Sequence, residues 1–276
     1  MTLRVTFLGC GTSTGVPRID GHWGKCNPAN PKNRRRRSSL LVERFADVDA
    51  ASADDRHAAK TTILIDTGPD VREQLLSAQV SGLDGVLYSH DHADHTHGID
   101  DLRIMCYARR KLVDLYFNRP TGELLMKRFD YCFATQPGSN YPPIVKAHII
   151  EPGQPITIAG AGGDVTVQPF RQLHGVIETL GFRIGGLAYS TDVHDFPDES
   201  LPTLEGLDMW IVDALRPQPH ASHLSVGQAL EWVERLQPKR AIFTHLAVEL
   251  DYDELSAMLP PDVEAAYDGM RFTMPY

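Results

Sequence analysis

The stretch Ser89-His90-Asp91-His92-Ala93-Asp94-His95 is the most informative part of this chain. It follows the apolar run Gly85-Val86-Leu87-Tyr88, so a buried strand leads directly into three histidines and two aspartates. Imidazole and carboxylate groups are common ligands of divalent metals. A single ion cannot use so many neighbouring donors, because they diverge in direction, but two ions about 3.5–4 Å apart can. The stretch therefore predicts a two-metal site at a sheet edge, and the alternative is a solvated polar turn.

Three further candidate ligands come at or just beyond runs that are typical of strands. They are His174, Asp192 and His245. A single histidine at a strand end is more often a hydrogen-bonded surface or core residue than a metal ligand. Together with the first stretch, however, these residues complete a set of seven donors: His90, His92, Asp94, His95, His174, Asp192 and His245.

Alternating and apolar runs predict strands along most of the chain, and amphipathic runs predict helices between them. We expect strands at 3–8 (half-buried), 39–43, 62–66, 85–88, 165–167, 181–184, 187–189, 209–212 and 240–244. We expect helices at 69–80, near 122–132, at 226–236 with Ser225 as a cap, and at 255–259. The Ala- and Asp-rich stretch 46–60 is typical of a solvated hairpin tip. This order predicts an α/β fold with two sheets face to face, in a single domain 1–276 with a mixed insertion around 100–145.

Composition excludes several classes of function. The chain has 276 residues, and a hydrophobic content of 42% is ample for a large core. No apolar run approaches the roughly 18 residues of a membrane span, and the N-terminus lacks the layout of a signal peptide. A net charge of −9 argues against long nucleic acid but allows a small phosphorylated substrate. The four cysteines are far apart, so we expect no disulfide framework and a cytoplasmic location.

In the order of its seven donors the chain resembles the metallo-β-lactamase-fold hydrolases, whose signature is His-x-His-x-Asp-His followed by His, Asp and His. The resemblance covers nearly the whole chain and implies a four-layer αββα sandwich. It implies that one metal is held by His90, His92 and His174, that the other is held by Asp94, His95 and His245, and that Asp192 bridges them. Zinc, manganese or iron suits such ligands. Asp91 is not a ligand in this scheme, and Asp66 is expected to accept a hydrogen bond from a ligand histidine.

The residues that differ between branches of this fold indicate a phosphodiesterase. True lactamases usually carry Cys where Asp192 stands and Arg or Cys where His95 stands. The runs 8–13, 66–70 and 95–103 are similar to those of the phosphoribosyl cyclic phosphate phosphodiesterases of phosphonate breakdown. This resemblance implies hydrolysis of a cyclic ribose phosphate or a nucleotide-like ester by a hydroxide between two metals, and a homodimer.

One departure from that branch concerns an additional structural zinc. The related enzymes hold this zinc with closely spaced cysteines and a histidine three residues beyond the last metal ligand. Here the corresponding stretch keeps only Cys26, and position 248 is Val. One thiolate without a partner histidine cannot close a tetrahedral site, so we predict no third zinc and a substrate that can differ from the family's namesake.

The catalytic prediction combines the ligand Asp94 with a histidine that protonates the leaving group. His223 and His220 are the two candidates, and we favour His223, because His223-x-Ser225 resembles the short histidine motif of the phosphodiesterase branch. Weaker candidates for substrate contacts are Thr12 and Ser13, in a glycine-rich loop that can aim backbone N–H groups at a phosphate, and the histidine at 194. His22, His97 and Arg103 could also line the pocket.

Four other interpretations remain open. The basic run 32–37, which includes Arg34–Arg37, could hold a nucleotide or tRNA backbone, but a solvated loop or pairing with nearby acids is more common. A tRNA 3′-processing endonuclease would need a protruding arm that the sequence does not suggest. A glyoxalase-type thioesterase would not need His223. A non-enzymatic binder of phosphorylated metabolites would not need a complete second metal site.

Overall fold

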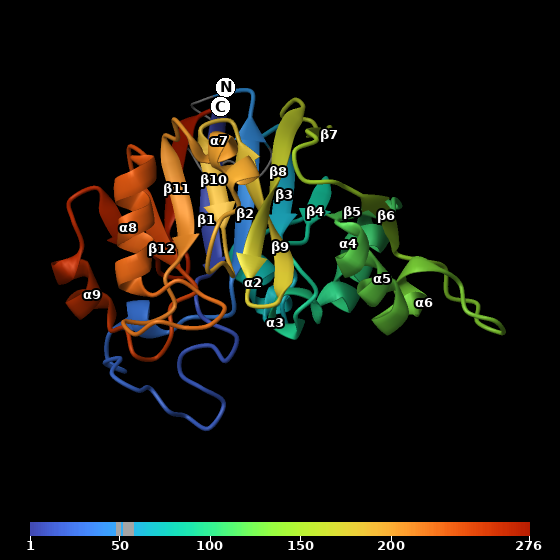
Figure 1. Ribbon diagram of the computed structural model, residues 1–276. Helices are drawn as coiled ribbons and strands as arrows, with labels where there is room; N and C mark the ends of the chain where they lie inside the picture. The colour runs from blue at the N-terminus through green and yellow to red at the C-terminus, as the bar shows by residue number, and fades with distance from the viewer. Residues whose placement is uncertain (48–50, 52–57) are drawn as a thin grey trace.

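The computed structural model describes residues 1–47, 51 and 58–276, and their strands form two seven-stranded sheets (Figure 1). The first sheet has the strand order β14 (Arg271–Pro275), β1 (Thr2–Gly9), β2 (Ser39–Phe45), β3 (Lys60–Ile65), β4 (Gly85–Leu87), β5 (Val113–Phe117), β6 (Val145–Ile149). The second has the order β13 (Val263–Ala265), β12 (Ala241–Thr244), β11 (Met209–Asp213), β10 (Leu187–Ser190), β9 (Ile177–Ile184), β8 (Val165–His174), β7 (Ile156–Ile158). The α-helices of the described residues are α2 (Val71–Ser77), α3 (Ala93–Thr96), α4 (Leu102–Arg109), α5 (Arg119–Arg128), α6 (Asp130–Phe133), α7 (Leu201–Leu204), α8 (Val226–Leu236) and α9 (Tyr252–Met258).

Separate apolar cores hold these layers together. The core between the sheets joins Phe7 and Ile63 of the first sheet to Phe182 and Ile211 of the second. A second core packs the outer face of the first sheet against α2, α4 and α5, and a third packs the outer face of the second sheet against α7, α8 and α9. Figure 1 shows α8 and α9 on one side of the sheets and α4–α6 on the other. The predicted four-layer αββα architecture is therefore confirmed.

Strand β1 differs from the half-buried strand that its alternation predicts. Every residue of β1 is buried, because β1 lies between two neighbouring strands and both faces of the sheet are covered. The polar positions are accommodated by pairing: Arg4 Nε lies 2.8 Å from Glu43 Oε2 on β2, and Lys60 Nζ lies 2.7 Å from Glu43 Oε1. The alternation of apolar and polar residues in β1 therefore distinguishes an apolar face from a polar face, and both faces are buried.

The region around 100–145 continues the first sheet. Strands β5 and β6 pair in parallel with each other, and β5 pairs with β4. The helix expected near 122–132 is two helices, because Phe129 leaves the helical conformation with φ −128° and ψ 39°. Asn118 starts α5 by accepting a hydrogen bond from the Thr121 backbone N–H. The main strands of both halves lie where the sequence predicts them, whereas β5–β7, β13 and β14 were not expected.

Two expectations concern the ends of elements. Ser225 caps α8, and its reciprocal hydrogen bonds with Gln228 form a capping box. Strands β2 and β3 pair as an antiparallel hairpin, but most of the predicted tip at 46–60 falls outside the described residues. Within the described chain, none of the helices is long and apolar enough to cross a bilayer.

Candidate metal centre

The seven predicted ligands meet at one edge of the two sheets. His90 and His92 follow β4, α3 carries Asp94 and His95, and the second sheet supplies the others from the ends of β8, β10 and β12. In Figure 1 this is the lower edge, where α3 lies. Parallel neighbours such as β10, β11 and β12 end at the same edge, which is why residues far apart in sequence converge there.

The backbone turns sharply at two of these ligands and at Asp66, which lies behind His95. Asp66, Asp192 and His245 have positive φ angles of 64°, 51° and 59°. Positive φ is uncommon outside glycine, and Asp, Asn and His tolerate it better than branched residues. Such conformations concentrate at functional sites, where the surrounding structure holds them in place.

Among the described residues the donors form four overlapping groups, and two of these groups face the carboxylate of Asp192 from opposite sides. Ligand atoms of His90, His92 and His174 lie within 4.8 Å of one another, as do those of Asp94, Asp192 and His245. The Oδ1 atom of Asp192 faces the first group, 3.8 Å from His90 Nε2 and 4.0 Å from His174 Nε2. Its Oδ2 atom faces the second group and lies 3.3 Å from His245 Nδ1. Asp192 thus presents one oxygen to each group, as a bridging ligand must.

His95 lies among the carboxylates of the second group. Its Nε2 atom is 3.2 Å from Asp94 Oδ2 and 3.1 Å from Asp192 Oδ2. Its Nδ1 atom is 2.8 Å from Asp66 Oδ2, and Asp66 also accepts hydrogen bonds from the backbone N–H and the hydroxyl of Ser89. Asp66 therefore lies where the sequence predicts it, orienting a histidine from behind.

Unpartnered nitrogen atoms show that these residues fit a metal. The Nε2 atoms of His90 and His95 are buried and make no well-aligned hydrogen bond among the described residues, although carboxylate oxygens of Asp94 and Asp192 lie close to His95 Nε2. Leaving such a group unsatisfied costs about 1–3 kcal/mol, and a divalent ion would take up its lone pair. The Nδ1 atom of His174 lies 2.6 Å from the carbonyl of Ser222, so Nδ1 donates and Nε2 keeps its lone pair. The donor set is therefore consistent with zinc, manganese or iron.

The protonation states of most of these ligands also suit metal binding. Burial lowers the pKa of His90 and of His245, and it lowers the pKa of His174 to about 4, so these imidazoles are neutral near pH 7. Burial alone would raise the pKa of Asp192, but the neighbouring His245 and His95 outweigh it and hold that pKa well below its usual range. His95 is the exception: burial opposes its charge, but Asp192, Asp94 and Asp66 outweigh burial and raise its pKa, so a metal ion would have to displace a proton from this ring. Neutral imidazoles and ionised carboxylates are the forms that ligate divalent ions.

His223 lies beside both groups and is held by a carboxylate. Its ring centroid is 4.6 Å from that of His174 and 4.9 Å from that of His245. Its Nδ1 atom is 2.7 Å from Asp213 Oδ2. Burial lowers the pKa of His223, but Asp213 outweighs burial and raises it to about 9. His220 lies one ring farther out, with its centroid 5.2 Å from that of His223.

Asp213 was not singled out from the sequence. It is the last residue of β11 and is fully buried, and it also accepts a hydrogen bond from the Val193 backbone N–H. A signal was available, because a carboxylate at the end of an apolar strand is the pattern that marks Asp66 in the same sequence. Ser38 is a second missed residue, with its Oγ atom 3.0 Å from His245 Nδ1.

The predicted substrate-contact residues lie at different distances from the centre. Thr12 is beside the last ligand, because its backbone N–H donates to the carbonyl of Leu246. Ser13 is exposed, and its carbonyl accepts from Arg37. His194 lies by the β8–β9 turn, where its Nδ1 atom accepts from the Gly175 backbone N–H.

The basic run 32–37 is held by partners within the protein. Arg36 pairs with Asp268 at 3.0 Å and Arg37 with Asp70 at 2.7 Å. The other cations of the run lie over aromatic rings or inside the protein: Lys32 over Tyr252 and Tyr267, Arg34 over Trp23, and Arg35 buried. The expectation of pairing with nearby acids is confirmed for two of these residues.

The thiol of Cys26 has a buried cation as its neighbour. Arg35 Nη1 lies 3.8 Å from the sulfur, and the thiol donates to the carbonyls of Val248 and Leu250. A guanidinium repels a dication, so these contacts agree with the prediction that no zinc binds there. The absence of this zinc stays a prediction.

Comparison with known proteins places the chain in a family. Residues 61–246 match the model of the beta-lactamase superfamily domain. A crystal structure described as a new diphosphatase from the PhnP family is 33% identical, with a TM-score of 0.85, and covers 99% of this chain and 98% of that one. The chain belongs to the PhnP family of the beta-lactamase superfamily. As a member of that superfamily, it carries in its histidine and aspartate clusters the donor set of a metal-dependent hydrolase.

Two other proteins are similar to this PhnP-family chain. Octanoyltransferase from Porphyromonas gingivalis (strain ATCC BAA-308 / W83) is 33% identical over 273 residues, which are 98% of this chain and 51% of that protein. The chain thus spans about half the length of that curated relative. Zn²⁺-bound PqqB from Methylobacterium extorquens shares the fold, with a TM-score of 0.71 at 17% identity, covering 98% of this chain and 99% of that one.

Proposed function

We propose that this protein hydrolyses a small phosphodiester at a centre of two divalent metals. The observation that carries this proposal is the position of Asp192, which presents one carboxylate oxygen to each of two ligand groups, with His223 beside both. Two divalent ions held by these groups would suit a phosphoryl group, whose oxygens bear the negative charge. A small phosphorylated substrate also agrees with the net charge of −9.

The chain's own residues divide the remaining work. Bound divalent ions would supply positive charge to the phosphoryl oxygens and would lower the pKa of a water molecule toward about 7. Asp213 occupies Nδ1 of His223, which leaves Nε2 of that ring for the substrate. As the oxygen of a water molecule bonds to phosphorus and loses a proton to solvent, the P–O bond to the leaving group breaks and His223 would give its Nε2 proton to the leaving oxygen. Such a proton transfer contributes typically about 10²–10⁴-fold. Asp66 and the Ser222 carbonyl hold His95 and His174 in their ligating orientations.

A diphosphate linkage is a second candidate substrate. The 33% identical PhnP-family structure is described as a diphosphatase, and a P–O–P linkage would meet the same centre through its phosphoryl oxygens. An acyl substrate has weaker support, because the octanoyltransferase relative is about twice as long as the part that matches. The expected homodimer stays a prediction that light scattering would test.

A substrate panel tests the proposal. Protein loaded with Zn²⁺ or Mn²⁺ is assayed on bis-p-nitrophenyl phosphate, a ribose cyclic phosphate, a nucleotide diphosphate, pre-tRNA and a thioester, with metal content measured in parallel. We expect turnover of a diester or of the diphosphate. Turnover of the thioester alone would overturn the proposal, and turnover of pre-tRNA alone would favour the endonuclease.

A further inference from the structure

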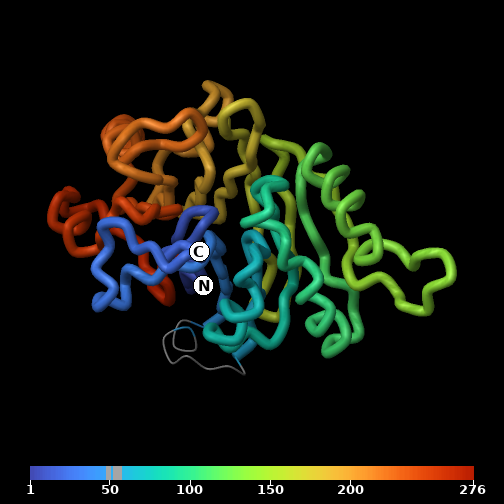
Figure 2. The backbone as a smooth tube through the Cα atoms, turned by 90° about the horizontal axis from the view of Figure 1, so that it is seen from below, coloured from blue at the N-terminus to red at the C-terminus, as the bar shows by residue number. Residues whose placement is uncertain are grey.

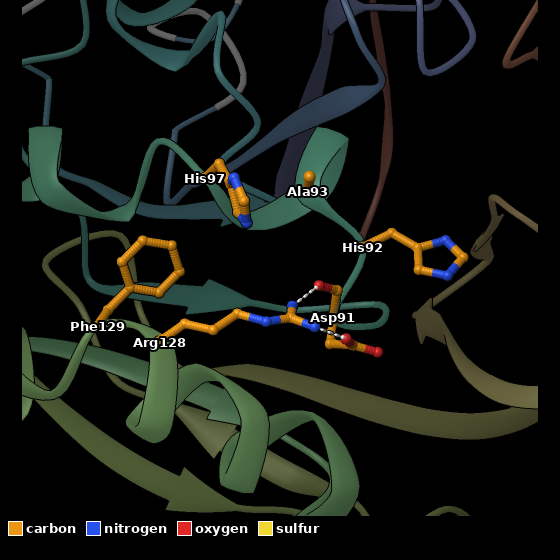
Figure 3. A pocket seen from close by; sticks show the side chains of 6 residues that line it. All are labelled: Asp91, His92, Ala93, His97, Arg128 and Phe129. Atoms are coloured by element: carbon orange, nitrogen blue, oxygen red, sulfur yellow. Dashed lines mark hydrogen bonds and ion pairs between the residues drawn. The ribbon is translucent and has the colours of Figure 1, made fainter.

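A cavity of about 430 Å³ opens beside the metal centre on the side of α5 and α6. Figure 3 shows the side chains that line it, which are those of Asp91, His92, Ala93, His97, Arg128 and Phe129. His92 belongs both to this wall and to the first ligand group, so the cavity adjoins the metal centre. Its volume lies within the range of roughly 300–1,000 Å³ that is usual for small-molecule sites.

Flat groups form much of the wall of this cavity. Phe129 is half-buried at the break between α5 and α6, and the ring of His97 meets it edge-on, with centroids 5.4 Å apart at 82°. The planar guanidinium of Arg128 extends past Phe129 toward Asp91 (Figure 3). Aromatic and guanidinium planes are the surfaces on which nucleic-acid bases stack.

The two charged side chains of this wall hydrogen-bond to each other. Arg128 donates from Nη1 to the carbonyl of Asp91 and from Nη2 to its carboxylate, at 2.8 Å for the second bond. The carboxylate also neutralises the guanidinium, so the cavity has little charge to offer a second phosphate. A bare sugar phosphate would need partners for its hydroxyls here. A nucleobase would present a π-face, which the wall matches.

We propose that this cavity receives a nucleobase of the substrate, which makes the substrate a nucleotide derivative and not a bare ribose phosphate. The inference rests on the proposed function for the position of the phosphate and adds what lies beside it. Phe129 and His97 act as specificity residues, and Arg128 acts as a planar support fixed by Asp91. The competing interpretation is that Phe129 only packs on the core and that Arg128 and Asp91 form an ordinary surface ion pair.

Binding measurements test the inference without turnover. Zn²⁺-loaded protein is titrated with AMP and with ribose 5-phosphate by calorimetry. Base stacking on one aromatic side chain is typically worth enough to change affinity about tenfold or more, so we expect AMP to bind at least about tenfold more tightly than ribose 5-phosphate. Affinity for AMP that is equal to or weaker than affinity for ribose 5-phosphate, or no AMP binding, overturns the inference.

Variants assign the effect to the cavity. Phe129→Leu keeps an apolar side chain for the core but removes the ring, and His97→Ala changes an exposed residue. Each should weaken AMP binding by roughly tenfold and leave ribose 5-phosphate binding unchanged. Tyr141→Ala is the matched control, because Tyr141 is an exposed aromatic residue of the same region that does not line the cavity. Unchanged AMP affinity in both cavity variants would overturn the assignment.

A kinetic comparison separates this inference from the proposed function. The two substrates are thymidine 5′-p-nitrophenyl phosphate and methyl p-nitrophenyl phosphate. A lower KM for the nucleoside diester, lost in Phe129→Leu, supports both proposals. Equal KM values with good turnover would leave the phosphodiesterase standing and overturn the nucleobase site. If neither diester is hydrolysed, the proposed function fails, and the AMP titration still decides the inference.

Discussion

The two ends of the segment 245–251 belong to two polar regions that are built in opposite ways. At one end, His245 joins the metal centre, where the buried Nε2 atoms of His90 and His95 make no well-aligned hydrogen bond in the described chain. At the other end, Asp251 joins a group that we call the loop cluster: Asn27, Asn33, Arg35 and Asp251. Figure 2 shows the early loops of residues 10–37 near the last part of the chain at this end of the molecule.

In the loop cluster the protein supplies nearly every partner itself. Asp251 accepts from Asn33 Nδ2 at 2.6 Å and from the Asn27 backbone N–H at 2.9 Å. Arg35 donates to the Ala247 carbonyl and to Asn33, although its Nε atom has no partner among the described residues. This contrast indicates how a metal site can be recognised in a structure without ions. Both regions are polar and largely buried, but only the metal centre contains imidazole nitrogens that lack a well-aligned hydrogen bond.

The largest effect is expected at the carboxylate shared by the two ligand groups. Asp192→Asn keeps the size of the side chain and tolerates the positive φ of 51°, but it removes the negative charge. We expect bound metal, measured by elemental analysis, to fall from two ions per chain to one or none. The lost electrostatic stabilisation is worth several kcal/mol, which corresponds to at least about 10³-fold in turnover.

Asp91→Asn is the matched control for that substitution. Asp91 lies in the same histidine-rich stretch, but its carboxylate binds Arg128 at 2.8 Å. The control should keep both ions. Equal metal content in Asp192→Asn and the natural protein would contradict the bridging role.

The next effect separates catalysis from metal binding within the centre. His223→Ala should keep both ions and lower kcat by about 10²–10⁴-fold, because the leaving oxygen loses its proton donor. Asp213→Asn should lower kcat by roughly 10–100-fold, since it removes only the group that orients the ring. His220→Ala is the control and should change kcat little. A larger loss in His220→Ala than in His223→Ala would move the acid to His220.

Sequence reasoning reached the metal centre because its ligands are marked by short-range signals. Each lies at or near the end of an apolar or alternating run, and the fold brings these ends to one edge. The sequence did not predict the loop cluster, because its contacts are long-range. Asn33 and Asp251 are 218 positions apart, and no local pattern links them. It also failed at Phe129, because a break inside an amphipathic helix depends on packing that composition does not encode.

A smaller effect, on stability alone, is expected in the loop cluster. Asp251→Ala removes the cap of α9 and leaves the buried amide of Asn33 without its acceptor. These losses should lower the free energy of unfolding by about 2–3 kcal/mol, measured by urea denaturation, with metal content unchanged. Asp253→Ala in the same helix is the control, because Asp253 is exposed and should matter by less than about 0.5 kcal/mol. Loss of metal in Asp251→Ala would show that the two regions are coupled.

The smallest expected effect is on the pH dependence of stability, which distinguishes the loop cluster from the metal centre. Burial would raise the pKa of Asp251, but hydrogen bonds from Asn27, Glu254 and Asn33 outweigh it and lower that pKa. A lowered folded-state pKa means that this carboxylate stabilises the fold fully above its unfolded pKa of about 3.9 and loses the contribution as pH falls through the folded value. The difference in urea midpoint between the natural protein and Asp251→Asn should therefore be constant from about pH 5 to about pH 7, because this range lies above the unfolded-state pKa. The difference should shrink below about pH 4. A difference that already shrinks between pH 7 and 5 would mean that the loop cluster reports the loss of metal ligation, which requires deprotonated histidines, and not the titration of Asp251.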